Sequence, residues 1–279
     1  MRIDDFDKLY LKLLQTLRDE GEKVPMGSWQ SQSTDGRPGM SYSIELRHVQ
    51  FRLSVPGDEE ALQNLVRPNL PWAEDHFLER VSGKPLNPPP SEAWWPYRVQ
   101  QNAEHKHGER FSHTYPERMW PKHAGRFFDG FGEDVPGYGI RYNLGDLDDL
   151  VNQLVRDPLT RQAYLPIWFP EDTGAVQGQR VPCTLGYRFL GRPRADGAIY
   201  YDITYDIRSC DLFRHFTDDV YMACRLLQWV VGKAREQGID ARPSLLIMNI
   251  SSLHLFEGDE FRLKQMTKDT EEEFYGAAV

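Results

Sequence analysis

The stretch Arg180-Val-Pro-Cys-Thr-Leu-Gly-Tyr-Arg-Phe189 alternates apolar and polar residues and carries a cysteine directly after a proline. Such alternation is typical of a strand with one buried face. Residues 198–208 show the same pattern and lead into Arg208-Ser-Cys-Asp211. From Asp218 to about Gln237 the apolar residues wrap widely around a helical repeat, which is typical of a buried central helix. These elements are predicted to form the core of the fold.

The other segments extend this pattern in both directions. Asp4 or Asp5 can cap a first helix that stops near Gly21, and 59–82 is helical with a break near Pro68 and Pro71. A further helix is predicted over 146–156, strands over 161–170 and 244–256, a strand or a hairpin over 41–53, a loop over 26–39 and a polar tail after Glu257. Because strands follow one another with few helices between them, the sequence indicates an α+β fold rather than an alternating βαβ fold.

Length and composition indicate one globular domain. We expect residues 1–279 to form a single domain in which 84–143, rich in aromatics and histidines but without periodicity, is a variable, insertion-like region. The net charge of −9 argues against binding to a nucleic acid polymer, whose phosphates need a basic surface. No apolar run approaches the ~18 residues of a membrane span, and the N-terminus lacks a signal pattern. Three cysteines without a Cys-x-x-Cys pair predict reduced thiols, a cytoplasmic protein and no metal site.

Four features could carry chemistry, and each also has an ordinary structural explanation. Cys183 is either a small core residue or a thiolate nucleophile. Arg208 with Ser209 forms either a surface ion pair or a grip on phosphate oxygens. Asp219 either caps its own helix or faces a ligand, and the neighbouring Asp218 makes one of the two superfluous as a cap. His254 on an apolar strand is either a core histidine or a functional one.

The order and spacing of these features resemble thymidylate synthase between about Pro158 and Phe256. The segment 161–170 resembles the family's arginine pair before a Trp-Asn-Pro strand, and Pro182-Cys-Thr184 resembles its Pro-Cys-His nucleophile segment. Ile207-Arg-Ser-Cys-Asp211 resembles its Gln-Arg-Ser-x-Asp strand, and His254-Leu-Phe256 its His-x-Tyr. The resemblance implies a large mixed sheet flanked by helices and a homodimer formed through the sheet face. The N-terminal half is similar only in outline.

Asp219 is the departure that bears on the substrate. It lies eight residues after Asp211, where thymidylate synthases hold an asparagine that reads uracil. A carboxyl group that accepts from the cytosine amino group and, when protonated, donates to ring N3 complements cytosine instead. The cytidylate hydroxymethylases have aspartate here, Cys-Thr at the nucleophile and a Ser-Leu-His stretch near the end, as this chain does. The chain therefore resembles that branch more than a true thymidylate synthase.

The resemblance also assigns roles to single residues. Substrate binding is expected from Arg161, which reaches the phosphate of the partner subunit, and from Arg208, Ser209, Asp219 and His254. Gln162 replaces the second arginine of the family's pair, and Phe256 replaces a tyrosine that bonds the sugar hydroxyl, so ribose and deoxyribose both stay open. The cofactor, 5,10-methylenetetrahydrofolate, is expected near Asp211, near Trp94 or Trp95, and under a C-terminal tail ending at Val279.

The implied reaction begins with Cys183 attacking C6 of CMP or dCMP, assisted by Asp219 at N3. Glu74 is chosen as the carboxylate that positions water, with Asp75 and Glu79 as rivals, and Tyr115 is placed near the abstraction of the C5 proton. Addition of water to the transferred carbon gives hydroxymethyl. Transfer of hydride instead gives methyl, as in a dCMP or dUMP methylase. A non-catalytic, nucleotide-binding member of the fold is the alternative from another class.

Overall fold

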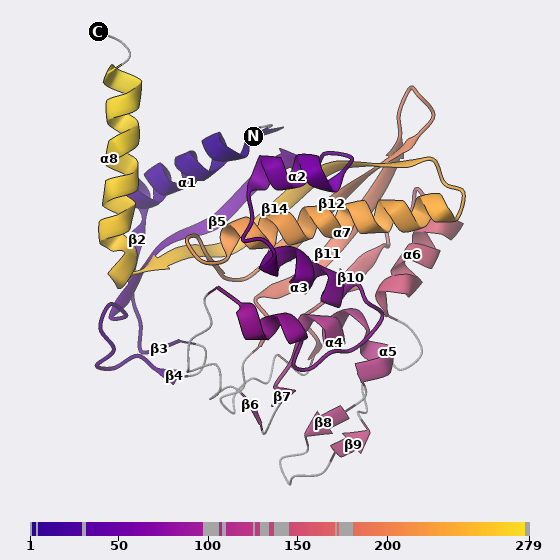
Figure 1. Cartoon of the computed structure of the whole chain (residues 1–279), viewed down its shortest axis with the longest axis horizontal. Coiled ribbons are helices and arrows are strands. Elements are labelled where there is room, and N and C mark those ends of the chain that lie inside the picture. The colour runs from indigo at the N-terminus through magenta and orange to yellow at the C-terminus, as the bar shows by residue number, and fades with distance from the viewer. Residues whose placement is uncertain are drawn as a thin grey trace.

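The computed structural model describes residues 2–3, 5–29, 32–96, 106–107, 110–124, 126–128, 134–136, 145–170, 172 and 181–276. Their centre is a mixed sheet of eight strands with the main order β1-β5-β14-β12-β11-β10, in which β2 also pairs with β5 and β13 with β14 (Figure 1). The strands are β1 (Arg2–Ile3), β2 (Glu22–Pro25), β5 (Tyr42–Ser54), β10 (Tyr164–Pro166), β11 (Thr184–Pro193), β12 (Ile199–Ile207), β13 (Cys210–Asp211) and β14 (Ala241–Phe256).

The order of pairing makes the sheet mixed. β11 and β12 form an antiparallel pair, and β12 then runs parallel to β14, its neighbour across the crossover helix α7 (Phe216–Glu236). β14 in turn runs antiparallel to β5 along most of its length. Three small antiparallel pairs lie outside this sheet: β3 (Ser28–Trp29) with β4 (Gln32–Ser33), β6 (Lys106–His107) with β7 (Arg110–Phe111), and β8 (Arg126–Phe128) with β9 (Asp134–Pro136).

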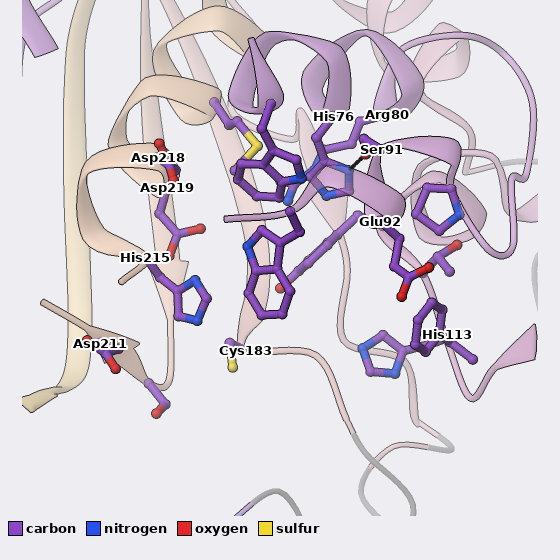
Figure 2. A pocket seen from close by; sticks show the side chains of 18 of the residues that line it. His76, Arg80, Ser91, Glu92, His113, Cys183, Asp211, His215, Asp218 and Asp219 are labelled. Carbon is purple, nitrogen blue, oxygen red and sulfur yellow. Dashed lines mark hydrogen bonds between the residues drawn. The ribbon is translucent and has the colours of Figure 1, made fainter. Parts of the chain in front are cut away.

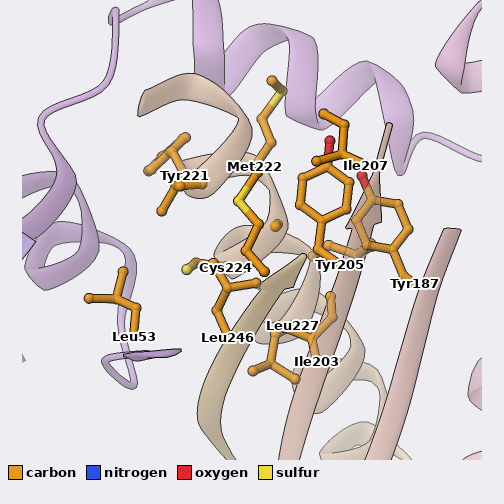
Figure 3. Close-up of a cluster of buried hydrophobic side chains, with 14 of the residues drawn as sticks. Leu53, Tyr187, Ile203, Tyr205, Ile207, Tyr221, Met222, Cys224, Leu227 and Leu246 are labelled. Carbon is orange, nitrogen blue, oxygen red and sulfur yellow. The ribbon is translucent and has the colours of Figure 1, made fainter. Parts of the chain in front are cut away.

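The helix α7 fills the centre of the molecule (Figures 1 and 3). It packs on β12 and β14, and the neighbouring α1 (Phe6–Glu20) packs on β5. Shorter helices then pack against α7: α2 (Glu59–Val66), α3 (Trp72–Arg80) and α6 (Leu147–Arg156). Its inward residues Cys224 and Leu227 are fully buried beside strand residues such as Ile203 and Leu246. Burial on several sides explains why its apolar residues wrap so widely around the helix.

Several predicted boundaries are confirmed and two are corrected. Asp5 caps α1 and Gly21 ends it, while the helices α2 and α3 are separated at the Pro68–Pro71 break. The strand predicted over 161–170 is only β10, three residues long, and the predicted loop over 26–39 contains β3 and β4. In the polar tail, η4 (Glu257–Asp259) leads into α8 (Glu260–Gly276), which packs against α1. The expected α+β class, with a large mixed sheet flanked by helices, is confirmed.

Short helices connect the sheet to the side where the pocket lies. They are η1 (Pro90–Trp94), α4 (Tyr115–Met119) and α5 (Pro121–Ala124). Thr114 starts α4 through a capping box with Glu117, because each side chain accepts from the other residue's backbone N–H. These helices supply ordered structure within the part of 84–143 that the structure describes. Across the described ranges, no helix combines the length and apolarity that crossing a bilayer requires.

Candidate active site

A pocket of about 240 Å³ opens where α3, η1 and α4 face the ends of β11, β13 and β14 and the first turns of α7. Figure 2 shows Asp219 and His215 on one wall, His76 and Ser91 on the other, and Cys183 between them. The pocket combines acids, histidines and a thiol with aromatic rings. Its lining consists of Trp29, Trp72, His76, Arg80, Pro89, Ser91, Glu92, Trp95, Phe111, Ser112, His113, Thr114, Tyr115, Cys183, Ser209, Asp211, His215, Asp218, Asp219, Met222, His254 and Phe256.

Cys183 precedes β11 and lines the pocket half-buried. Its carbonyl accepts from the backbone N–H of Arg208 at 2.9 Å, which fixes it against the end of β12. The Arg208 side chain donates to the carbonyls of Pro182 at 2.9 Å and Val181 at 3.2 Å. Arg208 therefore holds the segment before the thiol in place. It is not among the residues that line the pocket, so the expected contact with a ligand phosphate is not visible in this arrangement.

Asp219 lines the same pocket as Cys183 and does not cap its own helix by a side-chain hydrogen bond. The helix α7 begins at Phe216, which puts Asp218 and Asp219 in its first turn. Asp218 instead accepts from the backbone N–H and side-chain amide of Asn69 at 2.9 and 2.8 Å. The two carboxyl groups therefore have separate surroundings. Asp218 ties α7 to the segment before α3, and Asp219 faces the cavity.

The environment of Asp219 changes its acidity. Burial raises the pKa of Asp219 to about 7, against the opposing effect of the Arg80 guanidinium. Its Oδ2 atom lies 3.6 Å from the Sγ of Cys210, which donates to it. A carboxyl group with such a pKa is partly protonated near neutrality. It can therefore donate a hydrogen bond as well as accept one.

Tyr115 lies on the pocket wall beside the nucleophile segment. Its hydroxyl accepts from Thr184 Oγ1 at 3.3 Å, and Thr184 also pairs with Tyr205 at 2.9 Å. Burial raises the pKa of the Tyr115 phenol above its usual value, so this group stays protonated at neutral pH. The Arg80 guanidinium lies 4.2 Å from the centre of the Tyr115 ring, a cation–π contact. Tyr115 is thus positioned near Cys183 by α4 and by Thr184.

Three of the other candidate binding residues also line the pocket. Ser209, Asp211 and His254 line the pocket, and the backbones of Asp211 and His254 pair between β13 and β14. The Asp211 carboxylate also stabilises the turn before α7, because it accepts from the N–H groups of Phe213 and Arg214 and from the Arg214 side chain. Much of its hydrogen-bonding capacity is therefore used within the chain.

Of the two tryptophans expected near the cofactor, Trp94 and Trp95, one lines the pocket. Trp95 lines it and stacks on His215 with ring centroids 5.5 Å apart. Trp94 is 46% exposed and donates from Nε1 to Asp75 at 3.1 Å, away from the pocket lining. Arg161 is exposed just before β10 and is not part of the lining, while Val279 lies outside the described residues. The expected contacts of Arg161 with a partner subunit stay a proposal.

The structure places the Glu74 side chain between two helices and outside the pocket lining. Its carboxylate accepts from Tyr221 at 2.7 Å and from Arg225 at 2.7 and 3.0 Å, between α3 and α7. The physical reason is helical geometry: Glu74 lies two residues from both Trp72 and His76, which puts it on the other side of α3. Of its two rivals, Asp75 binds Trp94 outside the lining, whereas Glu79 bonds residues of the pocket wall.

The face of α3 that does reach the pocket carries Trp72, His76 and Arg80. Their spacing of four residues aligns them along one side of the helix. All three are buried, and the Arg80 Nε atom has no hydrogen-bond partner among the described residues. The sequence reasoning missed these residues. A pattern in the sequence could have identified them: an aromatic residue, a histidine and an arginine recur every four residues, which places them on one face of a helix.

The side chains of the site suit covalent and acid–base chemistry at a thiol and a carboxyl group. In the described ranges, no cluster of three or more His, Cys, Asp or Glu side chains could hold a metal ion. Aromatic rings of Trp29, Trp72, Trp95 and Phe111 line the cavity, which suits a flat heterocycle. Cys183, Asp219 and Tyr115 offer a nucleophile, an acid and a phenol to such a ring.

Comparisons with known proteins point in one direction. A scan against protein-family models finds no match. Thymidylate synthases of Lactococcus lactis subsp. lactis (strain IL1403) and subsp. cremoris (strain SK11) are each 25% identical to this chain, over 164 and 167 residues. The alignments cover 55% and 56% of this chain, which spans about half the length of these relatives, 53% and 54%. The chain is distantly similar to thymidylate synthase, and its mixed α+β architecture is consistent with such a fold.

Proposed function

We propose that this protein transfers a one-carbon unit from 5,10-methylenetetrahydrofolate to C5 of CMP or dCMP and releases the 5-hydroxymethyl nucleotide. The observation that carries the proposal is the shared pocket of Cys183 and Asp219, in which burial raises the pKa of Asp219 to about 7. A nucleophile alone suits any pyrimidine. An acid that both donates and accepts hydrogen bonds selects the amino edge of cytosine.

The first step uses the thiolate of Cys183. It adds to C6 of the ring, which saturates the 5,6 bond and makes C5 a carbon nucleophile. Protonated Asp219 donates to N3 as negative charge develops on the ring, and its other oxygen accepts from the amino group. This interaction strengthens in the transition state, so it raises the rate as well as the affinity. Tyr115, which stays protonated, is positioned to relay the proton that leaves C5.

The folate is a further part of the proposal. When bound, 5,10-methylenetetrahydrofolate supplies the one-carbon unit that C5 accepts. The aromatic lining of the pocket supports this use, because Trp95 and its neighbours can stack on a flat pterin ring. Asp211 at the pocket edge is available for one further hydrogen bond to it. Val279 at the C-terminus is retained as a proposed contact of the closed tail.

The nucleotide phosphate needs cations that the pocket wall supplies only in part. We assign Ser209 to it because this residue lines the pocket at the end of β12. Arg208 holds the backbone of Val181 and Pro182 in place, and its positive charge, outside the pocket lining, attracts the phosphate. His254 is assigned to the sugar. The exposed Arg161 completes the phosphate site across a homodimer.

One assay tests this function. Purified protein is incubated with the folate and with CMP, dCMP, UMP or dUMP labelled with tritium at C5, and both tritium release and product identity are measured. We expect release and hydroxymethyl product with a cytosine nucleotide, and neither from Cys183→Ala. Asp219→Asn should shift the preference toward uracil by about tenfold or more, since one good hydrogen-bond pair is worth about 1–3 kcal/mol. Release only from uracil nucleotides in the wild type contradicts the assignment to cytosine.

Methyl transfer is the second candidate, and one observation favours it. The relatives found by comparison are thymidylate synthases rather than hydroxymethylases. Mass spectrometry of the product separates the two, because a methyl product lacks the oxygen of the hydroxymethyl group. A third outcome, nucleotide binding without tritium release or a covalent Cys183 adduct, would identify a non-catalytic binding protein.

A further inference from the structure

His76 lies on the pocket wall beside Glu79, one of the carboxylates that the sequence offers for positioning water. Its Nδ1 atom lies 3.0 Å from Ser91 Oγ (Figure 2). The same atom lies 3.4 Å from Glu79 Oε2. Ser91 donates from Oγ to Glu79 Oε2 at 2.5 Å and from its backbone N–H to Oε1 at 2.6 Å. The Trp72 ring stacks on the imidazole with centroids 5.1 Å apart. These contacts fix the ring in position from two sides.

The network also fixes the tautomer. The Glu79 carboxylate only accepts hydrogen bonds, and the Ser91 hydroxyl proton is already given to Glu79. Nδ1 therefore faces two acceptors and must carry the ring proton. The lone pair is then on Nε2, which has no hydrogen-bond partner among the described residues and belongs to a side chain that lines the pocket. A carboxylate behind a histidine in this way is the usual means of orienting a general base.

His76 is neutral as well as oriented. Burial lowers the pKa of His76 to about 4, and the positive charge of Arg80 on the next turn lowers it in the same direction. Glu79 opposes these effects but does not reverse them. Burial alone would raise the pKa of Glu79, yet its hydrogen bonds from His76 and Ser91 bring it below the usual value. The pair therefore consists of a neutral imidazole and a carboxylate at neutral pH.

We propose that His76 is the base that takes the proton of the water molecule which adds to the transferred carbon, and that Glu79 and Ser91 position it. This inference rests on the proposed function and names the group that handles water in the same site. The water oxygen bonds to the exocyclic methylene carbon, whose double-bond electrons move into the ring, and one water proton goes to Nε2 of His76. The Cys183 sulfur then leaves C6 as a thiolate, which restores the 5,6 double bond. The proton released from C5 and the proton taken from water together match the two N–H protons that distinguish tetrahydrofolate from the methylene form.

The test separates carbon transfer from the addition of water. In a single turnover, with enzyme in excess over [5-³H]CMP or [5-³H]dCMP so that a stalled later step does not limit release, His76→Asn should still release tritium at a rate within about tenfold of wild type. Formation of the hydroxymethyl product should fall by about 10²–10⁴-fold, the usual contribution of a general base. Added 2-mercaptoethanol should then capture the methylene carbon as a thioether. The control, His48→Asn, changes an exposed histidine at positive φ, a conformation that asparagine tolerates, and should leave both rates unchanged.

Two results would overturn the role of His76. One is hydroxymethyl formation by the folded His76→Asn protein within about threefold of wild type, since a base contributes far more. The other is an equal loss of tritium release and product, which would place His76 before the addition of water. If the wild-type protein releases no tritium from any pyrimidine nucleotide, the proposed function itself is wrong. This result is distinguishable from the two above, which concern the His76→Asn variant of an active enzyme.

A measurement on the wild-type protein needs no active variant. The ¹⁵N chemical shifts of the His76 ring in the whole protein report which nitrogen carries the proton. We expect the Nδ1–H tautomer to persist from pH 5.5 to 8 and to lose dominance in Glu79→Gln, where an amide replaces the acceptor. An imidazolium at pH 7, or a dominant Nε2–H tautomer, contradicts the proposal even if the variants fail to fold.

Discussion

Asp219 is a residue whose function depends on its protonation, and its burial decides when it is protonated. Because its pKa is raised to about 7, the carboxyl group carries the proton that cytosine N3 needs below that pH and loses it above. We therefore expect kcat/KM for a cytosine nucleotide to fall as pH rises from 7 to 9, approaching tenfold per unit. A pH–rate profile measures this. Asp219→Asn, assayed with a uracil nucleotide, should lack that limb, and a wild-type profile that stays level to pH 9 contradicts the assignment.

The same carboxyl group affects stability. The pKa of Asp219 is about 7 in the folded protein and 3.8 in the unfolded chain. Between these pH values the folded state binds more protons than the unfolded state, so the free energy of unfolding falls as pH rises from 3.8 to about 7. Asp219→Asn removes this effect at similar volume. We expect the variant to melt several degrees above wild type at pH 8.5 and close to it at pH 4.5, measured by calorimetry. An equal difference at both pH values would show that burial of the charge is not the cause.

At the scale of single residues, the sequence could predict the pocket residues that belong to recognisable motifs. Cys183, Ser209, Asp211, Asp219 and His254 have fixed spacings in strands and turns, and the structure brings them to one pocket. Residues on α3 could not be ranked in this way. This short helix carries several carboxylates that could each position water, and the sequence does not show which one faces the pocket. Only the packing of the helix shows that Glu74 points to α7 while His76 points to the cavity.

At the scale of elements, Glu74 joins α3 to α7 through Arg225. The Arg225 guanidinium is largely buried and also donates to Glu59 at 2.8 Å. Glu74→Ala leaves this charge with one acidic partner, and breaking a buried pair costs about 3–5 kcal/mol. We expect a clearly lower melting temperature with kcat of the folded protein close to wild type. Glu60→Ala, at an exposed position of α2, is the control. Loss of kcat without loss of stability would restore Glu74 to the active site.

Elements with a strong periodic pattern were predictable, and elements that depend on partners were not. The long alternation of β5 and the wide apolar pattern of α7 each carry their own signal, which the structure confirms. The segment 161–170 reads as a strand, but it pairs with β11 only at Tyr164–Pro166. The helix α8 lacks a clear apolar stripe, and its contact with α1 is a tertiary feature that no local pattern reveals.

At the scale of the whole molecule, the exposed face of the sheet at β10 and β11 has properties of an interface. Leu159, Tyr164 and Leu190 are exposed apolar or aromatic side chains there, and Arg161 lies exposed between the first two. The pocket of the same chain does not include Arg161. These observations support the proposed homodimer in which Arg161 reaches the phosphate site of a second copy.

Mixing two inactive variants tests that arrangement. Cys183→Ala removes the nucleophile, and Arg161→Ala is expected to weaken nucleotide binding strongly, so each protein alone should have little activity. In a mixed dimer, one pocket combines the intact Cys183 of one copy with the intact Arg161 of the other. If the copies exchange at random, about half of the dimers are mixed and each has one intact site, so about a quarter of wild-type activity should return. Chains are exchanged by mild denaturation and refolding, and an equal mixture that was never unfolded is the control. Activity that stays at the level of the separate variants, although mass spectrometry detects mixed dimers, would show that Arg161 serves its own chain or none.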